Sequence, residues 1–166
     1  MDPPRRVLTR VEVAKQLVRP RGPVRYIQYS AQYPGQNIQF DILDLPRAKT
    51  MNQNYRYILG FIDVYSRKVW AYPMKKKSDV IEVFPQALVE IFGQLPLDRQ
   101  YTLQSDNDSV FLQPKIQDMI RRLGVHYKAQ RAGAKTLTSL IERWNRSMRN
   151  IIRLFTLGFD NHDWRS

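Results

Sequence analysis

The chain has 166 residues, 43% of them hydrophobic, so it can bury one ordinary core but is too short for two domains and too apolar to be disordered throughout. It lacks cysteine, which excludes disulfide scaffolds and thiolate metal sites. It also lacks an apolar run near 18 residues and a signal-peptide pattern, so we expect no membrane partner and no secretion. Its 27 Lys+Arg and 15 Asp+Glu give a net charge of +12, which favours nucleic acid as a partner over the alternative of charge kept for solubility.

Residues 1–36 are expected to form a basic N-terminal arm. This segment contains seven basic and two acidic residues, a charge of +5, and prolines recur along it. We therefore expect an extended chain with one short helical stretch near residues 10–18.

From Asn37 the pattern changes to that of strands. Residues on either side of Asp41 alternate with the period of two that strands show. Two more strands are expected at 55–63 and 68–72, joined by a short turn, and others at 100–104 and 125–128.

Three helices are expected among these strands. Ser78 is typical of an N-cap, apolar residues recur after it at helical spacing, and Pro85 should kink this helix or open its first turn. A second helix should begin at Pro114 and end at Gly124. After a loop at 129–139, a long helix should run to about residue 155.

The order is β-β-β-α-β-α-β-α, which predicts an α/β fold with a five-stranded mixed sheet flanked by helices. We place this core at residues 37–157 and a C-terminal tail at 158–166.

Three carboxylates in this plan are candidates for catalysis. Asp41 lies in mid-strand, where Asp is costly without a cation or donors, while Asp106 directly follows the fourth strand. Glu142 lies early in the last helix, with 35 residues between it and Asp106. Taken alone, each of these acids could be an ordinary structural or solvent-exposed residue. The helix and strand between Asp106 and Glu142, however, can bring all three acids to one rim of the sheet. Asp44 is the nearest competitor of Asp41, although strand parity puts it on the opposite face.

Clustered carboxylates repel one another unless a cation lies between them. Oxygen ligands suit Mg²⁺ or Mn²⁺, and one or two such ions could promote attack at phosphorus. Neither histidine is spaced to contribute: His126 is expected to be an ordinary strand residue and His162 a tail residue.

The runs IQFDILDL, YILGFIDVYSRKVWAYPMKKKS, LQSDNDSVF and LIERWNRSMR resemble, in order and spacing, the catalytic core of retroviral-type integrases (the rve family) over roughly residues 37–155. The pattern of these blocks is most similar to that of integrases of Polinton/Maverick-type DNA transposons. The resemblance implies an RNase H-like fold and metal-dependent 3′-end processing and strand transfer of element DNA into target DNA. It also implies that Asp41, Asp106 and Glu142 are the catalytic, metal-binding triad.

The same resemblance aligns Asn145, Arg146 and Arg149 with positions that contact terminal DNA. Helical spacing independently puts Glu142, Arg146, Arg149 and Arg153 on one face, the alternative being a solvated basic face. A separate stripe is expected to be buried: Leu137, Ile141, Trp144, Met148, Ile151 and Phe155.

The chain also departs from the family pattern. Asp106 and Asn107 are followed by Asp108, Ser109 and Val110 instead of a glycine and the usual residues, and the loop AGAKTLTS brings Lys135 as a further DNA contact. The missing cysteines exclude the family's zinc-binding domain and no C-terminal domain is visible, so we interpret the chain as a fragment or a stripped-down protein. The resemblance implies a homodimer or higher oligomer, acting in the nucleus or within a viral particle.

Two other functions stay open. One is an RNase H-like nuclease that cuts DNA without joining it; the other is an inactive, domesticated DNA-binding module. If Asp41 faced away from Glu142, Asp44 or Asp63 would take the first catalytic role.

Overall fold

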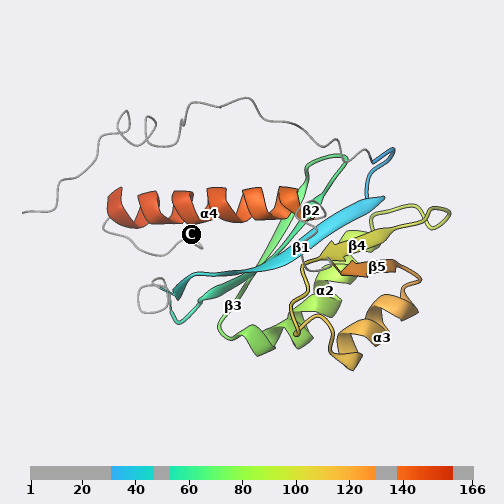
Figure 1. Ribbon diagram of the computed structural model, residues 1–166, viewed down its shortest axis with the longest axis horizontal. Coiled ribbons are helices and arrows are strands. Elements are labelled where there is room, and N and C mark those ends of the chain that lie inside the picture. Colours follow the sequence, from blue (N-terminus) through green and yellow to red (C-terminus); the bar gives the residue numbers. More distant parts are fainter. Residues whose placement is uncertain (1–30, 47–52, 130–137, 159–166) are drawn as a thin grey trace, which may run out of the picture.

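The computed structural model describes residues 31–46, 53–129 and 138–158. In chain order its elements are β1 (Asn37–Asp44), β2 (Tyr57–Asp63), β3 (Val69–Met74), the 3₁₀ turn η2 (Lys77–Asp79), α2 (Val80–Phe92), β4 (Thr102–Ser105), α3 (Pro114–Arg122), β5 (His126–Ala129) and α4 (Ser139–Gly158) (Figure 1). This order confirms the predicted α/β fold, which is consistent with an RNase H-like architecture. No helix in these ranges is long and apolar enough to cross a membrane.

The five strands form one mixed sheet in the order β3-β2-β1-β4-β5. The β1–β2 and β2–β3 pairs are antiparallel, whereas β1–β4 and β4–β5 are parallel. Four strands therefore point the same way, and their C-terminal ends meet along one edge, which we call the carboxyl rim. The central strand β1 carries the predicted acid Asp41 toward this rim.

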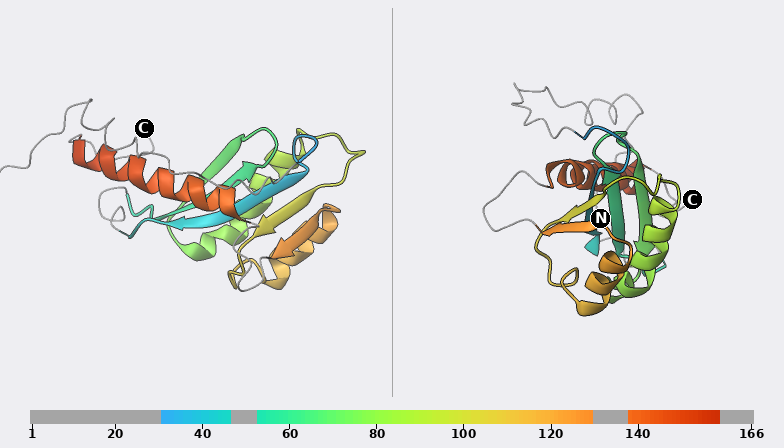
Figure 2. Two further views of the ribbon diagram at one scale, coloured as in Figure 1. Left: turned by 45° about the horizontal axis from the view of Figure 1, so that its top comes forward. Right: turned by 90° about the vertical axis from the view of Figure 1, so that its right-hand side faces the viewer.

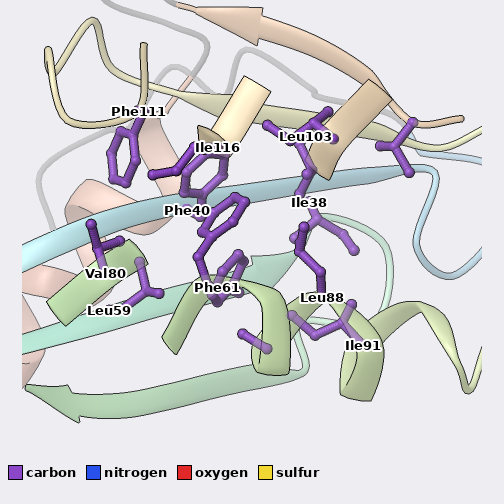
Figure 3. Close-up of a cluster of buried hydrophobic side chains, with 14 of the residues drawn as sticks. Ile38, Phe40, Leu59, Phe61, Val80, Leu88, Ile91, Leu103, Phe111 and Ile116 are labelled. Carbon is purple, nitrogen blue, oxygen red and sulfur yellow. The ribbon is translucent and has the colours of Figure 1, made fainter. Parts of the chain in front are cut away.

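One face of the sheet is covered by α2 and α3, which pack over an aromatic core. The Phe40 ring lies 5.4 Å from Phe61, 5.3 Å from Phe84 and 4.7 Å from Phe111, measured between centroids. All four rings are fully buried. Figure 3 labels Phe40, Phe61 and Phe111 within this cluster. Phe40 is thus a hub through which β1, β2, α2 and the segment before α3 share one apolar cluster.

The long helix α4 lies across the other face, over β1 and β2 (Figures 1 and 2). Leu43, Ile58 and Ile152 form a smaller buried cluster there, with Trp144 packed against it. Gly60 makes this approach possible, because a Cβ at that position would lie 2.4 Å from Trp144 Cζ3. The glycine of β2 is therefore the place where the indole of α4 rests on the sheet.

One helix prediction needs correction at the start of α2, and the expected kink at Pro85 stays a prediction. Ser78 is not an N-cap, because it lies inside η2; instead the Asp79 carboxylate accepts hydrogen bonds from the backbone N–H groups of Lys75 and Lys76. Pro85 lies within α2, which runs unbroken past it. The 3₁₀ turn before α2 is the local irregularity at the start of this helix.

The buried stripe predicted for α4 is correct only in part. Ile141 is buried and Trp144 and Met148 are half-buried, but Ile151 is about half exposed. Ile152 is buried instead, because the helix face that meets the sheet includes position 152 and not position 151. Leu137 lies outside the described residues, as do the arm up to residue 30 and the tail from residue 159.

Gly60→Ala should destabilise the docking of α4. The new methyl group overlaps the Trp144 ring, so the helix or the indole must shift, at a cost of about 1–3 kcal/mol in unfolding free energy. Urea unfolding should measure this loss. In a Trp144→Leu background the same change should cost much less; equal costs in both backgrounds would show that the contact does not limit packing.

Candidate active site

The three predicted acids lie around the junction of β1, β4 and α4. Asp41 is in the middle of β1, half-buried, on the face covered by α4, while Asp106 directly follows β4 at the carboxyl rim. Glu142 is exposed in the first turn of α4. The parallel pairing of β1 with β4 puts the first two on neighbouring strands.

Gln39, a fully buried side chain on β1, holds the start of α4. Its Oε1 accepts hydrogen bonds from the backbone N–H groups of Leu140 at 3.0 Å and Ile141 at 3.1 Å. These are among the N–H groups that a helix leaves unpaired in its first turn. A side chain about a hundred residues earlier in the chain therefore acts as a helix cap, and it brings Glu142 to the sheet.

Asp41 makes a second polar link to the same helix. Asn145 Nδ2 donates to Asp41 Oδ2 at 2.5 Å, and the backbone N–H of Ile42 donates to Asp41 Oδ1 at 2.7 Å. Asn145 is 3% exposed, so its side chain lies between strand and helix. In the structure Asn145 supports Asp41, and the DNA contact that the resemblance implies for it stays a prediction.

Burial and mutual repulsion govern the charges of these acids. The pKa of Asp41 is raised to about 7, first by burial and then by repulsion from Asp106. Burial is also the main cause that raises the pKa of Asp106, with added repulsion from Asp108 and Glu142. Asp106 therefore interacts electrostatically with both Asp41 and Glu142.

The turn after β4 explains how the chain accommodates Asp108. The Asp108 backbone N–H donates to Asp106 Oδ1 at 3.2 Å, and Asp108 Oδ1 accepts from the Val110 N–H at 3.1 Å. Asp108 Oδ2 pairs with Lys77 Nζ at 2.5 Å. The carboxylate of Asp108 therefore stabilises the turn that presents Asp106, and its charge is balanced by a lysine that sequence reasoning did not single out.

Asp44 and Asp63, the two alternatives to Asp41, interact with other groups. Asp44 forms a bidentate ion pair with Arg56, whose Nε and Nη2 donate to the two carboxylate oxygens at 2.7 and 2.8 Å. Asp63 is buried and accepts hydrogen bonds from the backbone of Gly35, from the backbone of Tyr65, and from the backbone and hydroxyl of Ser66. Neither replaces Asp41, which stays the acid predicted for the first role.

The donor set at this site fits a divalent metal ion in kind. It offers carboxylate oxygens, and Asn145 Oδ1 is buried with no hydrogen-bond partner among the described residues. Within those residues the acids do not converge as a ready group of three ligands. Glu142 Oε1 instead accepts from the Thr138 hydroxyl at 2.9 Å. Each acid is held by protein donors, and an ion would have to replace some of these hydrogen bonds.

The predicted basic face of α4 is exposed as expected. Arg146, Arg149 and Arg153 all reach the surface on the helix that carries Glu142. Arg149 approaches the carboxyl rim closely enough that its charge helps to lower the pKa of Asp44, an effect in which the Arg56 hydrogen bond is the largest cause. Lys135 lies outside the described residues.

Comparison with known proteins finds similarity to retroviral polyproteins. The chain is 30% identical over 123 residues, 74% of its length, to the Pol polyprotein of feline endogenous virus ECE1 and to the Gag-Pol polyprotein of baboon endogenous virus (strain M7). It is 30% identical over 131 residues, 79% of its length, to the Gag-Pol polyprotein of feline leukemia virus. It spans only 12%, 7% and 7% of these relatives, respectively. No family model matches the chain.

Gln39→Met should weaken the attachment of α4. Methionine keeps the size of the side chain but removes the oxygen, leaving the Leu140 and Ile141 N–H groups unpaired. We expect a loss of about 1–3 kcal/mol in unfolding free energy, together with faster hydrogen exchange at these two amides. Gln117→Met, which removes one hydrogen bond to Phe111, is the control and should leave α4 exchange unchanged.

The pKa of Asp41 predicts a pH dependence of stability. Because the pKa in the folded state, about 7, lies above the ordinary aspartate value of 3.8, the folded state binds a proton that the unfolded chain has released. The metal-free protein should therefore lose about 2–4 kcal/mol of unfolding free energy as pH rises through this window. Urea titrations of wild type and Asp41→Asn at several pH values check this. The difference between the two should shrink toward low pH; a constant difference would contradict the assignment.

Proposed function

We propose that this chain is an integrase-type polynucleotidyl transferase core that processes the 3′ ends of element DNA and joins them to target DNA. The observation that supports the proposal is that Asp106 repels Asp41 and is repelled by Glu142, while Gln39 and Asn145 join β1 to the helix that carries Glu142. Similarity to retroviral Pol polyproteins supports an integrase-like or nuclease-like activity. The net charge of +12 supports DNA as the substrate.

In this proposal each group near the acids has one role. Asp41, Asp106 and Glu142 would hold Mg²⁺ or Mn²⁺, which supplies Lewis acidity toward phosphorus and lowers the pKa of an oxygen nucleophile. Gln39 and Asn145 keep α4 and Asp41 in register, so they are positioning residues. Arg146, Arg149 and Arg153 bind backbone phosphates without reading bases.

Joining two element ends requires at least two active sites, so we propose that the chain works as a homodimer or higher oligomer. The similarity to viral polyproteins supports a viral or virion-associated context, to which we add action in the nucleus.

Two other functions predict different products. An RNase H-like nuclease on the same fold would release fragments without joining them, and an inactive module would bind DNA without changing it. The similarity to Pol polyproteins favours the nuclease as the second candidate.

Glu142→Gln should separate catalysis from binding. Glutamine keeps the length of the side chain and can still accept from Thr138, so α4 should stay docked. DNA binding should persist because the arginines remain. Metal-dependent joining of a 3′ end to a second duplex, and its reversal on a preformed branched product, should fall roughly 10²-fold or more.

Glu90→Gln is the matched control, since it makes the same change of charge on α2 and keeps an acceptor for the Tyr72 hydroxyl. It should retain the activity of wild type. Equal activity of wild type and Glu142→Gln on the branched product, with the fold intact, would leave only the binding module; cleavage without joining by wild type would favour the nuclease.

A further inference from the structure

Three consecutive lysines lie on the connection between β3 and α2. Lys75, Lys76 and Lys77 are all exposed and follow directly on Met74, the last residue of β3. Because β3 runs in the same direction as β1 and β4, this connection leaves the sheet at the carboxyl rim, where Asp106 also lies. We call these three residues the lysine rim.

The backbone of the lysine rim is held in place. Asp79 Oδ2 accepts from the N–H groups of Lys75 at 3.1 Å and Lys76 at 3.0 Å, which closes a tight turn before α2. Lys75 Nζ lies 5.2 Å from the centre of the Tyr55 ring, within the range of a cation–π contact. The ammonium groups thus extend from an ordered turn.

Lys77 connects the lysine rim to the acidic site. Its Nζ pairs with Asp108, two residues after Asp106, and its positive charge also acts on Asp106. The neighbouring Lys76 has no acidic partner among the described residues. One lysine is therefore used to balance the acidic turn, and the positive charge beside it is available for a ligand.

Cations also approach the acids from the side of α4. Both Arg149 of α4 and Lys77 of the lysine rim lower the pKa of Asp44, after the larger effect of Arg56. Two basic surfaces from distant parts of the chain thus come near the same carboxylate at the end of β1. Asp41 lies three residues earlier on that strand.

We propose that the lysine rim is a second phosphate-binding surface, which holds the backbone of duplex DNA across the acidic site from the arginines of α4. This inference rests on the proposed function, because it assigns a path to the DNA on which the acids would act. Phosphates would neutralise closely spaced ammonium groups, and contacts of this kind position a duplex without reading its sequence. The sequence predicted contacts on α4 and at Lys135; the lysine rim adds a further part of the interface.

The first test is the salt dependence of DNA affinity. Lys75→Gln/Lys76→Gln removes two charges from the lysine rim but leaves the Lys77–Asp108 pair intact. The control, Arg121→Gln/Arg122→Gln, also removes two charges, at the end of α3. The end of α3 leads into β5, the edge strand on the opposite side of the sheet from β3. With a fluorescent duplex oligonucleotide, the slope of log K against log salt should become shallower by about 2 for the lysine variant and change little for the arginine variant.

The second test measures contact directly. The chain contains no cysteine, so Lys76→Cys carries a single thiol to which an iron chelate can be attached. Hydroxyl radicals from the chelate should cut the DNA backbone at a few neighbouring nucleotides. The same chelate on Arg122→Cys should cut weakly and without a preferred position.

These outcomes separate the inference from the proposed function. If wild type binds the duplex but both double variants show equal slopes, and the chelate at position 76 gives no localised cutting, the lysine rim is a solvated surface and the inference fails alone. If wild type does not bind the duplex at all, the inference and the proposed function fail together. Circular dichroism of each variant shows that the fold is intact.

Discussion

The site depends on a short polar seam between β1 and α4. Gln39 caps the helix, and Asp41, two positions later on the same face, accepts from Asn145 one turn farther along it. Strand residues i and i+2 share a face, so two successive side chains hold one helix at two points. Without this seam the apolar contacts of Leu43 and Ile152 would hold α4 against the sheet but would specify its position along the strand less closely.

The seam also keeps a destabilising charge in place. Asp41 is half-buried and repelled by Asp106, so its ionised form is disfavoured, and its pKa is raised to about 7. A structural carboxylate such as Asp63 shows the contrast, because four hydrogen bonds, from Gly35, Tyr65 and Ser66, satisfy its oxygens. Acids that repel one another in a partly desolvated place are typical of functional sites, which is why Asp41 and Asp63 have different interpretations although both lie in strands.

The positive groups around this junction come from separate parts of the chain. Arg149 lies on α4, Arg56 precedes β2, and Lys77 begins η2, yet the charges of all three act on Asp44. The parallel directions of β1, β3 and β4 explain this convergence, because the connections that leave their C-terminal ends share one rim. This arrangement of acids with cations around them is the basis of the proposal that a polyanion binds here.

The sequence by itself determined the order of the elements and the mixed sheet, and it singled out three acids as candidates. Alternation, helical spacing and the 35 residues between Asp106 and Glu142 are local or nearly local patterns. Only the tertiary structure decided that Gln39 caps α4, that Asn145 is buried, and that Lys77 balances Asp108. Ile151 shows the limit well, since period alone does not fix which of two adjacent helical positions meets the sheet. These contacts join residues 31 to about 100 positions apart, and nothing in the local pattern specifies such a pairing before the sheet has formed.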